Sequence, residues 1–177
     1  DLGWEVYCAQ EDQAALYTIL TDAAAELGGG PVGSRALMSL RIEKGYGSWS
    51  REYSPEYWPQ ETGLDRLIKL DKDFLNKASY LAIKDNAPRE HLCVIEVLAA
   101  DIADATGGEP IFAPDGTPLG RVTSGGYGYS VGKSLALAYL RNAAAGQEVD
   151  VMILGKPHRG LVLAQPPFDP DGTKLRS

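Results

Sequence analysis

The amino-acid sequence predicts an α+β fold, in which a short α/β segment is followed by an antiparallel β-barrel. In the first part of the chain, apolar residues recur at helical spacing over long stretches. From His91 onward the pattern changes to short apolar or alternating runs separated by turn residues, which is typical of a closed antiparallel sheet. The change near Ala87-Pro88-Arg89 divides the chain into two predicted domains, residues 1–87 and 88–177.

The first domain is predicted to mix strands with helices. A strand is expected from Trp4 to Ala9, where apolar and polar residues alternate weakly, and a second strand from Gly63 to Leu70. One helix is expected from about Asp12 to Leu27, before Gly28-Gly-Gly-Pro, and another from Asp73 to Ile83. The apolar face of the first helix consists of Leu16, Ile19, Leu20, Ala23 and Leu27.

A third helix and an aromatic loop occupy residues 34–64. Ser34 is a plausible N-cap of this helix, and Gly45 is a plausible left-handed residue at its C-terminal end. The loop that follows concentrates large rings with polar tips, suited to packing over a buried site or against another domain. These aromatic residues are Tyr46, Trp49, Tyr53, Tyr57 and Trp58.

Six short runs are candidate strands of the barrel. Pro114-Asp-Gly-Thr is a turn signal between two of them. The run from Ser134 to Leu140 is ambiguous, because its leucines and alanines suit a helix as well as a strand. The runs are His91 to Ala99, Pro110 to Ala113, Leu119 to Ser124, Ser134 to Leu140, Glu148 to Leu154 and Gly160 to Ala164.

Composition and charge indicate which partners and which location are expected. The formal net charge of the 177-residue chain is −7, so it would repel a phosphate backbone, and no nucleic-acid partner is expected. The two cysteines, Cys8 and Cys93, show no secreted-domain spacing, which predicts a cytoplasmic location. No apolar run approaches the length of a membrane span, so no membrane partner is expected. The first residue is Asp rather than Met, which predicts that the chain starts inside a larger protein.

Nucleotide and metal sites are not predicted. In Gly126-Tyr-Gly-Tyr-Ser-Val-Gly-Lys-Ser, a phosphate loop would require glycine at position 127, where the sequence has Tyr. A glycine-rich turn between two barrel strands explains this segment better, and no dinucleotide fingerprint follows a strand elsewhere. Neither the cysteines nor His91 and His158 have a recognised zinc spacing. Spacing alone does not exclude a serine or cysteine nucleophile, but nothing local supports one, and the catalytic residues stay unknown.

Several ordered motifs resemble one family. They are Arg-Ala-Leu-x-Ser-Leu-Arg-x-Glu-Lys-Gly-Tyr from Arg35, Leu2-Gly-Trp-Glu-Val-Tyr, Gly120-Arg-Val-Thr-Ser-Gly-Gly-Tyr and Pro167-Phe-Asp-Pro-Asp-Gly-Thr-Lys-Leu-Arg. Together they resemble the C-terminal half of the folate-binding domain in dimethylglycine and sarcosine dehydrogenases, which is similar to the glycine cleavage T-protein, an aminomethyltransferase. The resemblance favours a strand over 134–140, since the T-protein C-terminal domain is a distorted jelly-roll barrel.

The resemblance also implies a function. The parent protein is expected to be an FAD-dependent N-methylglycine dehydrogenase, in which a flavin domain oxidises the amine and a folate domain captures the released carbon on tetrahydrofolate. This chain would supply one wall of the folate site, with no flavin of its own. The upstream half of the folate domain, which holds the catalytic aspartate of the T-protein, and the flavin domain would be its partners. The isolated chain is therefore expected to be inactive.

Three residues are the expected folate ligands: Glu5, Arg41 and Tyr46. Glu5 lies in Gly-Trp-Glu, which resembles the T-protein element whose glutamate binds the pterin ring, and a carboxylate can accept two parallel hydrogen bonds from a pterin. Arg41 lies two residues from Glu43, so the two face different ways on a helix. The alternative to a role for Arg41 at the folate end of the site is structural and is favoured by the residues alone: one of the two pairs across a domain contact and the other is solvated. The T-protein pattern has a functional arginine four residues before Arg41, where this chain has Leu37.

Two alternatives stay open. The first is a stand-alone aminomethyltransferase or demethylase similar to the T-protein. The second is a non-catalytic folate-binding or scaffold domain.

Overall fold

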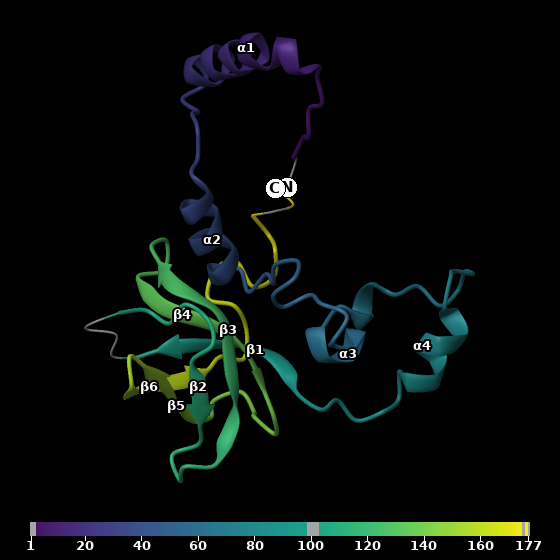
Figure 1. The fold of residues 1–177 in the computed structure, drawn as a ribbon, viewed down its shortest axis with the longest axis vertical. Helices are drawn as coiled ribbons and strands as arrows, with labels where there is room; N and C mark the ends of the chain where they lie inside the picture. The colour runs from purple at the N-terminus through teal and green to yellow at the C-terminus, as the bar shows by residue number, and fades with distance from the viewer. Residues whose placement is uncertain (1–2, 99–102, 175, 177) are drawn as a thin grey trace.

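A computed structural model describes residues 3–98, 103–174 and 176, which form a β-barrel with helical segments attached to it (Figure 1). The helical part contains α1 (Gln13–Glu26), α2 (Ser34–Glu43), α3 (Pro59–Thr62) and α4 (Lys77–Ile83), with 3-10 turns η1 (Gln10–Asp12) and η2 (Asp65–Leu67). The barrel strands are β1 (His91–Val97), β2 (Pro110–Phe112), β3 (Pro118–Gly128), β4 (Lys133–Leu140), β5 (Glu148–Ile153) and β6 (Lys156–Val162). The predicted fold class is confirmed by this barrel.

The barrel is closed and antiparallel throughout, with strand order β1-β4-β3-β2-β5-β6. β1 pairs with β6 through Ile95 opposite Val162, which closes the sheet and leaves no edge between these two strands. A tight turn at Gly116 joins β2 to β3, as the Pro114-Asp-Gly-Thr signal predicts. The core inside the barrel is formed by alternate residues of every strand, among them Ile95, Ile111, Val122, Ala138 and Val151.

Strand β4 is buried on both faces, which explains why its sequence does not alternate. Ala136, Ala138 and Leu140 point into the barrel core. The intervening Leu137 and Tyr139 are also fully buried, because the helical part covers the outer face of this strand. The Tyr57 ring, for example, stacks on the Tyr139 ring with centroids 3.6 Å apart. A strand of this kind reads as a continuous apolar run, so periodicity cannot separate it from a helix.

Helix α2 lies against β3 and β4 and ends in a well-defined cap. The Gly45 N–H donates to Ile42 O and the Tyr46 N–H donates to Arg41 O, while Gly45 has φ +69°. This is a Schellman cap, as predicted at Gly45. The predicted N-cap is wrong: Ser34 is the first helical residue, and Gly33 precedes it without a side-chain cap.

The N-terminal segment differs from its prediction. Residues 4–9 form no strand in the structure, because no other strand among the described residues lies beside them. The predicted helix is present as η1 and α1, but its apolar residues are largely exposed, including Ile19 and Leu27. Figure 1 shows α1 standing away from the barrel, connected to α2 by an extended stretch.

The arm that contains α3, η2 and α4 projects sideways from the barrel (Figure 1). The strand predicted for Gly63 to Leu70 is wrong, because Gly63 is a left-handed cap of α3 and residues 65–67 form η2. The helix predicted for residues 73–83 is present only over Lys77–Ile83. The division into domains at residue 87 stays a prediction. None of the helices in the described ranges is long and apolar enough to cross a membrane.

Candidate functional site

A pocket of about 450 Å³ lies where helix α2 meets residues 163–174, which we call the C-terminal segment. Two of the three predicted folate ligands, Arg41 and Tyr46, line it together. The other lining residues are Leu37, Leu40 and Lys44 from α2 and its cap, and Phe168, Asp169 and Lys174 from the C-terminal segment. We call this the α2 pocket. Leu37 gives this wall an apolar side chain.

The guanidinium of Arg41 is held by the protein itself. Its Nη2 donates to Ser124 Oγ at 2.7 Å, and its Nη1 donates to Tyr46 O at 3.0 Å and faces Glu52 Oε2 at 3.4 Å. The Arg41 side chain is 9% exposed, and burial lowers its pKa while the Glu52 charge opposes that shift. Arg41 therefore presents mainly its aliphatic stem to the pocket in this structure.

Glu52 is the carboxylate that pairs with the Arg41 guanidinium. Burial disfavours its charged form, but hydrogen bonds from the Ser124 hydroxyl and the Ser48 N–H outweigh burial and keep the pKa of Glu52 below its ordinary value. Glu52 is thus a buried anion that balances the charge of Arg41.

The C-terminal segment forms the opposite wall. The Lys44 ammonium donates to Asp169 Oδ2 at 3.0 Å and also to the Asp169 carbonyl. Burial opposes the charge of Asp169, but Lys44, the Lys174 N–H and Thr173 lower the pKa of its carboxyl well below the ordinary range. The Lys174 ammonium lies 4.8 Å from the centre of the Phe168 ring. The motif starting at Pro167 marked this segment as part of the family pattern, but no site role was predicted for it.

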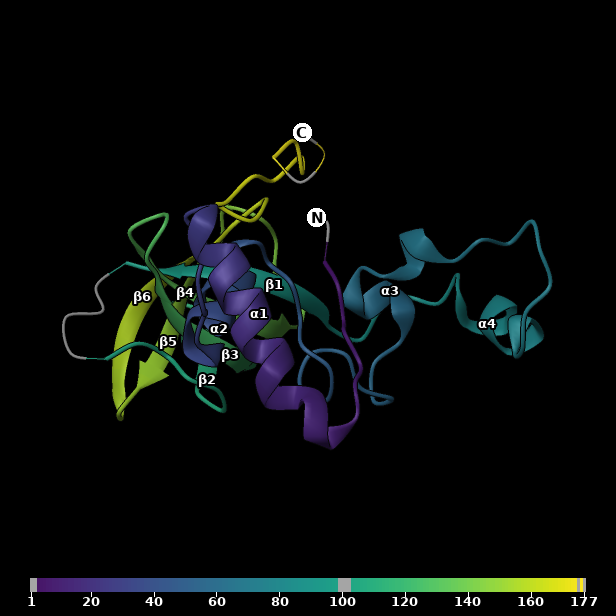
Figure 2. The same cartoon turned by 90° about the horizontal axis from the view of Figure 1, so that it is seen from above.

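Glu5 lies outside the pocket, on the exposed N-terminal segment. The Tyr7 hydroxyl donates to Glu5 Oε2 at 2.5 Å, and this bond raises the pKa of Tyr7. In Figures 1 and 2 this segment, drawn in dark purple, lies between the beginning of α1 and the side of the molecule that carries the yellow C-terminal segment. No described contact joins Glu5 to Arg41 or Tyr46 in this structure.

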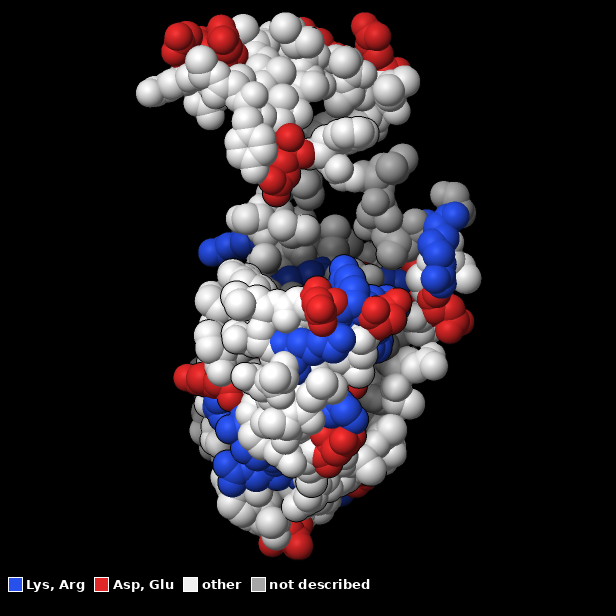
Figure 3. All heavy atoms as spheres, turned by 90° about the vertical axis from the view of Figure 1, so that its right-hand side faces the viewer, with Lys and Arg blue, Asp and Glu red and all other residues white. Residues whose placement is uncertain are grey.

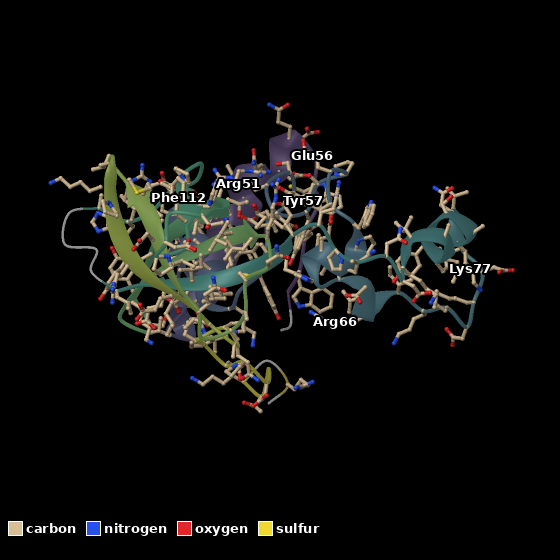
Figure 4. The ribbon with its side chains drawn as sticks, turned by 90° about the horizontal axis from the view of Figure 1, so that it is seen from below. Arg51, Glu56, Tyr57, Arg66, Lys77 and Phe112 are labelled. Carbon is tan, nitrogen blue, oxygen red and sulfur yellow. The ribbon has the colours of Figure 1, made fainter. Side chains whose placement is uncertain are left out.

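Two further hollows lie on the aromatic loop. An apolar groove of about 510 Å³ is lined by Trp49, Tyr53, Tyr57 and neighbouring prolines and aliphatic residues. A polar hollow of about 420 Å³ shares Tyr57 with it and includes Arg51 and Glu56. Figure 4 shows Arg51, Glu56 and Tyr57 close together where the chain leaves the barrel toward the α3 arm. The predicted aromatic cluster is therefore partly packed on the barrel and partly open.

The remaining sequence candidates are not brought together as sites. The Gly126 to Ser134 segment spans the end of β3, a turn and the start of β4, so it is a hairpin turn as predicted. No group of potential metal ligands converges among the described residues. Burial raises the pKa of Cys93 to about 11, which disfavours the reactive thiolate.

The closed antiparallel barrel and the helical part before it match two domains of one protein family. Residues 1–72 match the GCVT N-terminal domain, and residues 91–169 match the glycine cleavage T-protein C-terminal barrel domain. The chain belongs to the glycine cleavage T-protein family.

Within this family the chain is similar to enzymes of two kinds. It is 38% identical over 180 residues to the mitochondrial dimethylglycine dehydrogenase of Rattus norvegicus, covering 99% of this chain and 21% of that protein. It is 34% identical to the aminomethyltransferase of Symbiobacterium thermophilum, covering 93% of this chain and 44% of that protein. The crystal structure of aminomethyltransferase T from Bartonella henselae has the same fold, with a TM-score of 0.75 at 23% identity, over 89% of this chain and 44% of that one. The chain thus spans about a fifth of the dehydrogenase's length.

Proposed function

We propose that this chain is one wall of a tetrahydrofolate-linked one-carbon transfer domain, within a flavin-dependent dehydrogenase of N-methylated glycines. The upstream half of the folate domain and a flavin domain that binds FAD are the proposed partners in the parent protein, and the proposed location is the cytoplasm. Family membership and the similarity to dimethylglycine dehydrogenase support this function over that of a folate-binding scaffold.

The observation that carries the proposal is the opposite chemistry of two regions. No Lys or Arg precedes Arg35 in the sequence, and Figure 3 shows the lobe around α1 with acidic residues and no basic ones. The α2 pocket instead is lined by three basic residues, Arg41, Lys44 and Lys174, and by one acidic residue, Asp169. Glu52 balances the charge of Arg41, and Lys44 pairs with Asp169. A folate has a pterin ring with N–H donors at one end and glutamate carboxylates at the other. The acidic segment with Glu5 suits the donors, and the α2 pocket suits the carboxylates.

The residues present are compatible with such a ligand. The Glu5 carboxylate is exposed, and each of its oxygens has two lone pairs, so the bond from Tyr7 leaves acceptor capacity for a pterin. Tyr46 adds an aromatic ring, 46% exposed, at the rim of the α2 pocket. Tetrahydrofolate would supply the acceptor for the one-carbon unit. The role of this chain would be to bind and orient it.

A second candidate function is that of an aminomethyltransferase without a flavin domain. The 34% identity to the Symbiobacterium thermophilum enzyme, over 93% of this chain, favours it. The two candidates share the folate site and differ in the source of the one-carbon unit. Flavin absorbance and dimethylglycine-dependent dye reduction by the full-length protein would distinguish them.

The test is a Glu5→Gln variant of the full-length protein, titrated with tetrahydrofolate. Gln replaces one acceptor with a donor that faces the donors of the pterin, and a charge-assisted hydrogen bond contributes roughly 1.5–3 kcal/mol, so affinity should fall by about ten- to a hundredfold. Amine oxidation should be unaffected, because that chemistry belongs to another domain.

A Glu11→Gln variant is the matched control, because Glu11 is an exposed glutamate on the same N-terminal segment, outside the predicted site. Its affinity for tetrahydrofolate should equal that of the wild type. Equal affinities of both variants and the wild type would contradict the assignment of Glu5. A wild-type protein that binds no tetrahydrofolate at all would contradict the proposed function.

A further inference from the structure

Glu52 is fully buried and lies behind the α2 pocket without lining it. Its Oε1 accepts a hydrogen bond from the Ser124 hydroxyl of β3 at 2.5 Å. Its Oε2 accepts one from the Ser48 N–H at 2.7 Å and faces Arg41 Nη1. Removing a charge from water in this way costs several kcal/mol unless it is paired and hydrogen-bonded, and here both conditions are met.

The contacts of Glu52 lead directly to the rim of the pocket. Arg41 Nη1, which faces Glu52, also donates to the carbonyl of Tyr46 at 3.0 Å. Ser124 Oγ bridges the same two groups, since it accepts from Arg41 Nη2 and donates to Glu52. The backbone of Tyr46 is therefore fixed by a guanidinium whose own position is set by Glu52.

A second link ties the same loop to the barrel. The buried Tyr139 hydroxyl on β4 donates to the carbonyl of Glu52 at 2.8 Å. Strands β3 and β4 both hold Glu52, one by its side chain and the other by its backbone. The loop from Tyr46 to Tyr53 is therefore anchored to the barrel as well as to helix α2.

We propose that Glu52 is a positioning residue of the α2 pocket, which sets ligand affinity through Arg41 and Tyr46 without touching the ligand. This inference rests on the proposed function for the identity of the ligand, tetrahydrofolate. Without the carboxylate, the Arg41 guanidinium loses its balancing charge and its fixed position, and the Tyr46 carbonyl loses its fixed donor. Both changes loosen groups at the pocket rim, and ordering them again when the ligand binds lowers its affinity.

The experiment compares Glu52→Gln with Glu61→Gln in the full-length protein. Glu61 is a matched control, because it is also a buried, ion-paired glutamate, but it lies in α3 outside the α2 pocket. Calorimetric titration with tetrahydrofolate, well below the melting temperature of each variant, should show about tenfold weaker binding for Glu52→Gln and less than a twofold change for Glu61→Gln. Equal effects of the two substitutions, or no effect of either, would overturn the inference.

Hydrogen exchange separates this inference from the proposed function. In Glu52→Gln, the backbone amides of residues 46–53 should exchange faster, whereas those of residues 58–62 should not. If the wild type binds no tetrahydrofolate, the proposed function fails, and unchanged exchange at residues 46–53 would then refute positioning as well.

If Glu52→Gln does not fold, Ser124→Ala removes the bridging hydroxyl and keeps the ion pair, and about threefold weaker binding is expected. Unchanged affinity of a folded Ser124→Ala would count against the proposal.

Discussion

Replacing Glu61 with Gln is expected to loosen the α3 arm from the barrel. Glu61 accepts hydrogen bonds from the Arg89 side chain at 2.6 and 2.8 Å, from the Arg89 N–H at 2.9 Å and from the Trp58 N–H at 2.8 Å. The Arg89 guanidinium also lies 4.7 Å from the centre of the Trp58 ring. These contacts join the beginning of α3 to the segment just before β1, and they make Glu61 the main polar link between the two.

The expected magnitude follows from the burial of the two partners. The Glu61 side chain is fully buried, whereas that of Arg89 is 53% exposed. Hydrogen bonds to charged groups contribute roughly 1.5–3 kcal/mol, and the exposed arginine stays hydrated when its partner is neutralised, so a loss of about 2 kcal/mol is expected. If the arm opens locally, the Trp58 and Arg89 amides should exchange roughly thirtyfold faster in Glu61→Gln, since about 1.4 kcal/mol corresponds to a factor of ten.

The same link should make the arm sensitive to acid. The hydrogen bonds from Arg89 lower the pKa of Glu61 from 4.5 to about 2, against the opposing effect of burial. Because this pKa is lower in the folded protein, the carboxylate stabilises the fold fully above about pH 4.5 and loses this effect as the pH falls toward 2. Glu61→Gln should lack this acid transition, and salt should weaken the wild-type link because Arg89 is half exposed.

The assay is amide exchange of the wild type and of Glu61→Gln between pH 5 and pH 3, corrected for the intrinsic effect of pH. Glu56→Gln is the matched control, because it removes the same charge from an exposed side chain in the same loop. Equal protection of Trp58 and Arg89 in Glu61→Gln and in Glu56→Gln would refute the argument.

Two further predictions concern packing. A Cβ on Gly120 would collide with the Tyr139 carbonyl across the β3–β4 pair, so Gly120→Ala should lower the free energy of unfolding by roughly 2–3 kcal/mol, measured by denaturant titration. Gly126→Ala, which has open space, should change it little, and equal losses would contradict the prediction. The Trp49 side chain, 84% exposed beside the apolar groove, should let the purified chain bind a hydrophobic fluorescent dye, and Trp49→Ser should reduce that signal. A monomeric chain that binds no dye at high concentration would contradict it.

The barrel could be predicted from the sequence because burial alternates along several of its strands, and apolar residues in the sequence follow this alternation. In β5, Val149, Val151 and Ile153 are buried while the residues between them are less so, and this alternation is visible in the sequence. The strand ends differ from the structure by a few residues, since turn geometry decides where pairing stops. For β4, which is buried on both faces, the family resemblance rather than periodicity favoured a strand, and the structure confirms it.

The candidate site was predictable only in part. The family motifs led to Arg41 and Tyr46 as expected folate ligands, and the structure shows both in the lining of one pocket. The contacts that join Arg41 to Glu52 and Ser124 could not be foreseen. Ser124 is 83 residues from Arg41 in the chain, and a single sequence carries no signal for a contact at that separation. The Lys44–Asp169 pair spans 125 residues and was missed for the same reason.

The two strand predictions that failed, over residues 4–9 and 63–70, have a common physical cause. A strand is stable only when its backbone pairs with a neighbour and one face is covered, and neither condition is met by the described residues around Trp4 or Leu67. Trp4 and Tyr7 are each more than 80% exposed, and Tyr17, Ile19 and Leu20 on α1 are also exposed. Exposed large apolar side chains of this kind are typical of surfaces that another protein surface covers. The proposed upstream half of the folate domain is the partner whose backbone could pair with residues 4–9 and whose side chains could cover α1.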